Sequence, residues 1–236
     1  MFPNVEISGG LMYNTVGDEV EADIRYMDES LVLCVKPAGV SSEDEMPALL
    51  RAGCGAREIF CVHRLDTAVG GLMVYAKTKA AAAGLSQAIA RGALIKEYLA
   101  VSGGAPVDDA GVMRDLLYRD KAKNKSYVVS RPRRGVREAE LSYRVLERRG
   151  GESLVSVRLG TGRSHQIRVQ FASRGMPLLG DVKYGSARRD CRIALWSRRL
   201  CFAHPLTGQS VDMSVSPPES EPWTDFMYFK KETDNG

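Results

Sequence analysis

The sequence has few of the residues that metal sites and disulfide frameworks require. Its 236 residues include three histidines and five cysteines, and no two cysteines form a Cys-x-x-Cys pair. An odd number of cysteines without paired spacing argues against both a disulfide framework and a zinc site. We therefore expect reduced thiols, as in a cytoplasmic protein.

Long apolar runs are also absent. The N-terminus shows no basic segment followed by an apolar one, and no apolar run approaches the length that crosses a bilayer. These two absences predict a cytoplasmic protein without a membrane partner.

The composition supports one substantial hydrophobic core, since hydrophobic residues make up 44% of the chain. We expect one main domain over residues 24–216. Residues 1–23 are expected to form an N-terminal arm or an extra strand. The tail over residues 217–236 should pack on the domain and fray at its end.

The charge balance is mildly basic, at +4 from 33 basic and 29 acidic residues. The arginines gather in three clusters: Arg131, Arg133, Arg134 and Arg137; Arg188, Arg189 and Arg192; and Arg198 with Arg199. Such clusters more often form solvated faces than RNA contacts, so this feature alone leaves both interpretations open.

Hydrophobic periodicity predicts more strands than helices. Strands are expected near residues 31–35, 71–76, 98–101, 141–145, 155–159, 193–202 and 211–215. Helical spacing predicts a helix over residues 79–91 with Thr78 as its cap, and a second helix that Ser164 caps and that runs to about Arg174. Because the strands do not alternate strictly with helices, we predict an α+β fold with a mixed, largely antiparallel sheet.

One candidate site is the run Val62-His63-Arg64-Leu65-Asp66, which precedes the Gly70-Gly71 bend. In an extended segment Arg64 and Asp66 point to one side, so the pattern places a charge pair beside the apolar Leu65. A carboxylate in such a loop can meet a ligand. On these residues alone, an aspartate that caps a turn or pairs with Arg64 is the commoner explanation.

A second candidate site is the run from Gly162 to Arg168, a polar and doubly basic segment after a glycine turn. Amides at a helix start, together with the guanidinium groups of Arg163 and Arg168, can hold a phosphate or a carboxylate. The alternatives are a generic anion site, or an Arg168 side chain that simply lies along the helix surface.

Together the two runs resemble the RluA-type RNA pseudouridine synthases. That family has a His-Arg-Leu-Asp run before a glycine-containing strand, and a later Gly-Arg-x-His-Gln-x-Arg run. Further matches in the expected order are Lys36-Pro37-Ala38-Gly39, Lys96-Glu97-Tyr98-Leu99-Ala100, Gly180-Asp181-Val182-Lys183-Tyr184-Gly185 and His204-Pro205. The resemblance covers roughly residues 24–216, which would then form the catalytic domain.

The resemblance implies the pseudouridine synthase fold, in which helices and loops flank the sheet around a central RNA-binding cleft. It also implies that the protein isomerises a uridine of ribosomal or transfer RNA to pseudouridine. Asp66 falls on the catalytic aspartate, Tyr98 on the aromatic residue that stacks on the target base, and Arg168 on the arginine that pairs with the aspartate. Positions expected to bind substrate or RNA are His63, Arg64, Arg163, His165 and Gln166.

The reaction breaks the bond from C1′ to N1 and rejoins the uracil through C5, without redox change or hydrolysis. It therefore requires neither a cofactor nor a metal. Asp66 could attack C1′, attack C6, or abstract a ribose proton, and the sequence leaves these three routes open. The uridine must leave the base stack, which calls for an aromatic platform and for basic groups that hold neighbouring phosphates.

The chain departs from the family pattern at flanking positions. Val69-Gly70 stands where members often have Thr-Ser, and Gln170 and Trp196 stand where members often have histidine. The family's frequent N-terminal S4 domain is not expected, because about two dozen residues precede the first core strand. We expect a monomer that needs no protein partner.

Two other functions fit parts of the sequence. A noncatalytic RNA-binding or ribosome-assembly protein would use the same basic surface, but it would not explain why Asp66, Tyr98 and Arg168 occur together. A phosphodiesterase built on His63 and His165 would need a paired acid and base or an activated water, and few histidines are available.

Overall fold

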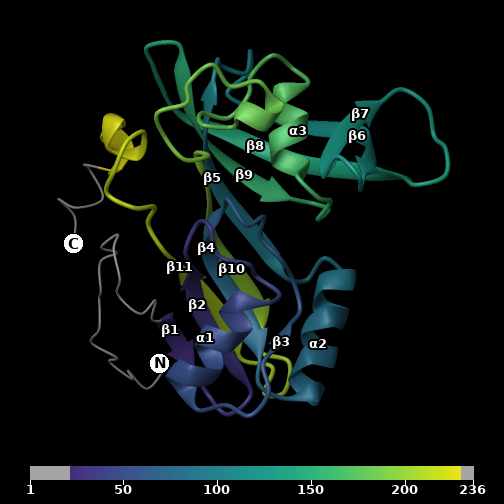
Figure 1. The fold of residues 1–236 in the computed structure, drawn as a ribbon, viewed down its shortest axis with the longest axis vertical. Coiled ribbons are helices and arrows are strands. Elements are labelled where there is room, and N and C mark those ends of the chain that lie inside the picture. The colour runs from purple at the N-terminus through teal and green to yellow at the C-terminus, as the bar shows by residue number, and fades with distance from the viewer. Residues whose placement is uncertain (1–21, 230–236) are drawn as a thin grey trace. The chain divides into compact units, whose positions relative to one another are not determined.

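The computed structural model describes residues 22–229 and divides the chain into two compact units. Within the described residues, unit 1 consists of residues 22–94 and Leu200–Val215, and unit 2 of Ile95–Arg199 and residues 216–229. Nearly all of the expected N-terminal arm, and the last seven residues of the tail, lie outside the described residues. Figure 1 shows the elements of both units.

Unit 1 contains strands β1, β2, β3, β4 and β11 and two helices. Their bounds are β1 Asp23–Met27, β2 Leu31–Lys36, α1 Glu45–Cys54, β3 Phe60–Cys61, β4 Gly70–Ala76, α2 Lys79–Ala90 and β11 Ser210–Ser214. β2 pairs with β1 on one side and with β4 on the other, β3 also pairs with β4, and all three pairings are antiparallel. Both β2 and β4 are buried along their whole length, as their continuous apolar sequences predict.

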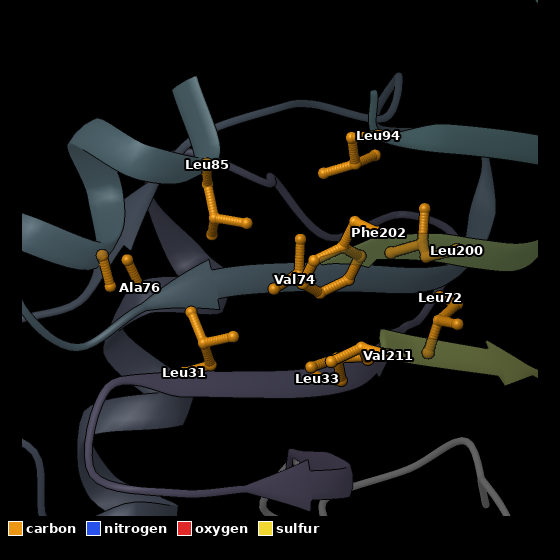
Figure 2. Close-up of a cluster of buried hydrophobic side chains, with 11 residues drawn as sticks. Leu31, Leu33, Leu72, Val74, Ala76, Leu85, Leu94, Leu200, Phe202 and Val211 are labelled. Carbon is orange, nitrogen blue, oxygen red and sulfur yellow. The ribbon is translucent and has the colours of Figure 1, made fainter. Parts of the chain in front are cut away.

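The core of unit 1 forms where alternate residues of β2 and β4 face helix α2. Leu31 and Leu33 of β2 and Leu72 and Val74 of β4 pack with Leu85 of α2, as Figure 2 shows. The cluster also contains residues from the late segment of the chain, namely Leu200, Phe202 and Val211. Fully burying a side chain of this kind stabilises a fold by about 1.5–3 kcal/mol.

Helix α2 begins as the sequence predicts. The Thr78 hydroxyl accepts a hydrogen bond from the Ala81 amide at 3.2 Å. This bond satisfies one of the amides that a helix N-terminus leaves without a partner. Gly92 follows the helix with φ 68°, a conformation that favours glycine.

Unit 2 contains strands in the order β5, β9, β8, β6 and β7, and β7 lies at the edge. The bounds are β5 Ile95–Gly103, β6 Ala110–Asp120, β7 Lys125–Val129, β8 Val136–Arg149, β9 Glu152–Leu159 and α3 Gln166–Ala172. Each neighbouring pair in this order is antiparallel. The predicted α+β class with a largely antiparallel sheet is therefore confirmed.

Two further segments complete the units. Strand β10, Leu195–Ala203, contributes residues 195–199 to unit 2 and residues 200–203 to unit 1. In the described part of the tail, Trp223 and Phe226 are buried against Leu99 and Leu154 of unit 2. No helix within residues 22–229 is both long enough and apolar enough to span a membrane.

The start of helix α3 differs from the expectation that Ser164 caps it. The helix begins at Gln166, and the preceding His165 adopts a left-handed conformation with φ 54°. The Ser164 carbonyl instead accepts a hydrogen bond from the Ser126 hydroxyl at 2.7 Å. The Gln166 side chain accepts from the Arg163 amide, which precedes the helix, at 2.9 Å, and the side chain of the N-cap residue His165 does not cap the first turn.

Candidate active-site elements

The residues predicted to form the site fall into both units. Unit 1 carries His63, Arg64 and Asp66, whereas unit 2 carries Tyr98, Arg163, His165, Gln166 and Arg168.

Asp66 lies in the loop between β3 and β4, and the residues on both sides of it are fixed. Leu65 is buried, its amide donates to the Ser42 hydroxyl at 3.1 Å, and the same hydroxyl donates to the Leu65 carbonyl at 3.0 Å. The Asp66 carbonyl accepts from the Val69 amide at 2.9 Å, which closes a turn. The Asp66 side chain is half-buried. The loop therefore holds a carboxylate at a defined, accessible place.

A buried lysine supports the same loop. The Lys36 side chain is fully buried and its ammonium donates to three carbonyl groups, those of Pro37 at 2.7 Å, Val40 at 2.8 Å and Thr67 at 3.2 Å. Burial lowers the pKa of Lys36 to about 8, and the charge of Asp66 opposes this shift. Lys36 thus ties the residue after Asp66 to the turn that follows β2, and it interacts electrostatically with the Asp66 carboxylate.

Arg64 and His63 flank Asp66 but are held differently. Arg64 is exposed and pairs with Glu43 at 2.8 Å, rather than with Asp66 as the sequence pattern indicated. An exposed pair of this kind contributes little to stability and leaves the guanidinium within reach of a ligand. His63 is buried, and its Nε2 accepts a hydrogen bond from the Val74 amide at 3.1 Å. This contact joins the loop to strand β4.

In unit 2, Tyr98 lies in the middle of β5 opposite Val157 of β9. Only 5% of its surface is exposed. Packing therefore fixes the ring, and little of its surface is open to a base in this structure.

Arg168 of α3 is buried and forms a bidentate ion pair with Asp181. Its Nε donates to one carboxylate oxygen of Asp181 at 2.6 Å and its Nη2 to the other at 2.8 Å, in the two-pronged geometry that arginine favours. The side chains are only 6% and 1% exposed. The guanidinium carbon also lies 5.1 Å from the centre of the Tyr184 ring. Arg168 therefore has one well-defined orientation.

Tyr184 also joins the start of α3 to strand β7. Its hydroxyl lies 2.9 Å from His165 Nδ1 and accepts a hydrogen bond from the Ser126 amide at 2.8 Å. Burial raises the pKa of the Tyr184 hydroxyl. His165 is itself buried, so its ring is positioned by protein contacts.

Gln166 is buried, whereas Arg163 is exposed. The side-chain amide of Gln166 hydrogen-bonds to the protein itself. Its oxygen also accepts from the Thr161 hydroxyl at 2.8 Å, and its nitrogen donates to the Glu140 carbonyl at 2.9 Å. Arg163 is exposed and donates through Nε to the Glu138 carbonyl at 2.9 Å. Gln166 thus shapes the turn, while Arg163 presents its charge to solvent.

The two histidines of the motifs are both buried. His63 and His165 belong to different units, and each is less than 10% exposed. Within residues 22–229, no group of three or more histidine, cysteine or carboxylate side chains is arranged to hold a metal ion.

Two residues of the site lie in motifs visible in the sequence, but the sequence assigned them no role. Asp181 lies in the Gly-Asp-x-x-Tyr-Gly run, and Lys36 in the Lys-Pro-Ala-Gly run. The only sign in the sequence that Asp181 has a role is its place in this motif, beside a glycine and near a tyrosine. Asp181 could not be connected to Arg168 because the contact between them depends on the folded chain.

Comparison with known families is consistent with this geometry. The family model described as RNA pseudouridylate synthase matches residues 30–173. The ribosomal large subunit pseudouridine synthase D of Zymomonas mobilis is 31% identical over 226 residues, which cover 85% of this chain and 71% of that protein. The uncharacterized RNA pseudouridine synthase YlyB of Bacillus subtilis is 31% identical over 223 residues, or 87% and 72% of the two chains.

Two solved structures share the fold. The human RNA pseudouridylate synthase domain containing 1 has a TM-score of 0.73 and 23% identity over 84% of each chain. The human RNA pseudouridylate synthase domain containing 4 has a TM-score of 0.71 and 24% identity over 84% of this chain and 89% of that one. The expected pseudouridine synthase fold is therefore confirmed.

Proposed function

This chain belongs to the RluA-type RNA pseudouridine synthase family, and from that premise we propose that Asp66 is the carboxylate with which it isomerises uridine in ribosomal or transfer RNA. Membership makes the protein an isomerase that acts on RNA. Relatives named for the ribosomal large subunit favour ribosomal RNA as the substrate. An enzyme with that substrate would work in the cytoplasm, where we expect this protein to be found.

The fixed loop around Asp66 is the observation that carries the assignment. Leu65 and Thr67 on either side are held by the Ser42 hydroxyl and by the Lys36 ammonium. A nucleophile or base gains rate from being held in one geometry, because the entropy of orientation is lost during folding and not during the reaction. All three chemical routes require an ionised carboxylate at this position.

We assign the remaining residues the roles that the family resemblance implies. We assign Tyr98 to stacking on the displaced base and Arg168 to supplying positive charge. Arg64 and Arg163, both exposed, are assigned to phosphates near the target nucleotide. Gln166, His63 and His165 are positioning residues in this proposal, because protein contacts hold them.

The reaction balances without any added reactant. The glycosidic bond between N1 and C1′ breaks, a bond between C5 and C1′ forms, the C5 hydrogen leaves as a proton, and N1 gains a proton. Asp66 begins the sequence by attack at C1′, by attack at C6, or by removal of a ribose proton.

The test is to map pseudouridine in total RNA from cells with and without the gene, by carbodiimide adducts that stop reverse transcription. One or a few sites should disappear on deletion. They should return with the wild-type protein and with the exposed control variant Asp108→Asn, but not with Asp66→Ala or Asp66→Asn.

Two results would contradict the proposal. Pseudouridine restored by Asp66→Asn would remove Asp66 from the chemistry. A deletion that changes no site in ribosomal or transfer RNA would reject the proposed substrates. Purified Asp66→Asn should still bind RNA with the affinity of the wild type, since the substitution leaves the positive surface intact.

A further inference from the structure

Positive charge is concentrated in one short segment of unit 2. Residues 119–137 contain eight lysines and arginines and one aspartate, which gives this segment a formal charge of +7. The whole chain carries +4, so all other residues together are net acidic. We call this segment the basic hairpin; it comprises the end of β6, strand β7, their connecting loops and the first residues of β8.

Six of the eight basic side chains of the basic hairpin are exposed to solvent, and carboxylates of the described residues do not neutralise them. The side chains classed as exposed are Lys121, Lys123, Arg131, Arg133, Arg134 and Arg137. Within residues 22–229, no carboxylate forms an ion pair with any lysine or arginine of the hairpin. Unpaired cations of this density repel one another, so they are stabilised when a polyanion binds.

The other two arginine clusters behave differently. Arg188 pairs with Asp190 at 3.0 Å and with Glu221 at 2.8 Å. Arg199 pairs with Glu97 at 3.0 Å. The three arginine clusters, which the sequence could not distinguish, therefore differ in the structure. One has no ion pairs with carboxylates of the described residues, and the other two each contain an arginine that pairs with a carboxylate of the protein.

Aromatic rings lie among the cations of the hairpin. Tyr118 of β6 and Tyr127 of β7 are direct cross-strand partners, so their side chains lie on the same face. The Arg133 guanidinium lies 4.6 Å from the centre of the Tyr118 ring, and the Lys125 ammonium lies 5.8 Å from that of Tyr127. A face that mixes cations with partly exposed rings fits phosphates and bases together.

The hairpin is fixed to the segment that begins α3. The Ser126 hydroxyl donates to the Ser164 carbonyl at 2.7 Å, and the Ser126 amide donates to the Tyr184 hydroxyl at 2.8 Å. The Tyr184 ring in turn lies beside the Arg168 guanidinium. A ligand on the basic hairpin would therefore be held at a defined position relative to helix α3, which carries Arg168.

We propose that the basic hairpin is a docking surface for the sugar–phosphate backbone of RNA, and that it supplies affinity separately from the residues that carry out the reaction. The inference rests on the proposed function in taking RNA as the substrate. Arginine forks suit phosphate oxygens, and the exposed ring of Tyr127 suits an unstacked base.

The test compares two variants in which the same number of arginines is replaced. The first replaces Arg131, Arg133 and Arg134 with glutamine, in a loop where no strand pairing is disturbed. The control replaces Arg25, Arg114 and Arg148 with glutamine, which are exposed but paired with Asp23, Glu140 and Asp109. Binding of each protein to a fluorescein-labelled RNA stem–loop is measured by anisotropy over a series of KCl concentrations.

A plot of log affinity against log salt concentration falls with salt, and it should be less steep for the hairpin variant. The magnitude of its slope should decrease by roughly 2–3, at about 0.7–0.9 for each phosphate that the variant no longer neutralises. Its Kd at low salt should rise about tenfold or more. In the modification assay the effect should appear in KM rather than in kcat. The control should change the slope by less than about 1.

Several outcomes would overturn the inference. Equal effects of the two variants would mean that net charge alone matters. A hairpin variant with unchanged slope and Kd would show that RNA binds elsewhere, and competition by polyglutamate as effective as by RNA would indicate an acidic protein partner. If the hairpin variant loses affinity as expected while the wild type modifies no RNA, the docking surface stands and the proposed function falls.

Discussion

Removing the carboxylate of Asp181 should reveal how strongly unit 2 depends on the buried pair with Arg168. The pair is two-pronged, at 2.6 and 2.8 Å, and the Asp181 side chain is 1% exposed. Taking away one partner of a buried ion pair costs about 3–5 kcal/mol. For a domain whose free energy of unfolding is about 5–15 kcal/mol, this is a large fraction.

The assay is urea unfolding followed by tryptophan fluorescence. Both tryptophans of the chain, Trp196 and Trp223, belong to unit 2, so the signal reports on the unit that contains the pair. The Asp181→Ala variant should unfold at a lower urea concentration, with a free energy of unfolding reduced by about 3–5 kcal/mol.

A double variant tests the physical reason for that destabilisation. Replacing both partners, as Arg168→Met with Asp181→Leu, removes both buried charges and should recover at least half of the stability, because apolar pairs of similar size often replace buried ion pairs without cost. Pseudouridine formation should be abolished in the double variant, since the guanidinium is gone. A single Asp181→Ala variant within about 1 kcal/mol of the wild type, or a double variant as unstable as the sum of the singles, would refute the reasoning.

Two other predictions concern Lys36 and a pair of glycines. Because the pKa of Lys36 is lowered to about 8 in the folded protein, this side chain binds fewer protons in the folded than in the unfolded chain between about pH 8 and 10.5, so its own contribution to the free energy of unfolding rises across that window by up to about 3 kcal/mol. Burial raises the pKa of the Cys34 and Cys61 thiols and acts in the opposite direction, so the test is the difference between proteins: in urea titrations over this window Lys36→Met should lose stability relative to the wild type, the exposed control Lys79→Met should follow the wild type, and the same pH dependence in all three proteins would contradict the prediction. Gly180→Ala should cost at least about 2 kcal/mol more than Gly185→Ala, because both positions have positive φ but only at Gly180 would the new Cβ meet a backbone oxygen, that of Arg192. Equal melting temperatures for the two alanine variants would show that the close approach at Gly180 can relax.

Much of the fold could be predicted from local patterns. The apolar runs of β2 and β4 and the Thr78 cap each depend on a few neighbouring residues, so the sequence contains the whole signal. Helix α1 was not predicted, even though Gly55, with φ 64°, ends it. Its short apolar stripe lies among acidic and small residues, which weakens the periodic signal.

The contacts of the site depend on distant parts of the chain and could not be predicted in the same way. The motif placed Arg168 as a charged residue, but its clamp by Asp181 comes from a separate motif. Similarly, the sequence shows a lysine before Pro37, but not that its side chain is buried and bonded to Thr67. The roles of Asp66 and Tyr98 come from family resemblance and remain predictions.

The order in which the chain is made has a consequence for unit 1. Its core needs Leu200, Phe202 and Val211, which are synthesised long after Leu31 and Leu72. At about 5–20 residues per second, the early strands would wait several seconds or more for the segment that covers them. The five strands β5 to β9 of unit 2 are contiguous in sequence and can pair during that interval. The N-terminal unit should therefore finish folding second, and its apolar strands are the segment of a nascent chain that a chaperone would protect.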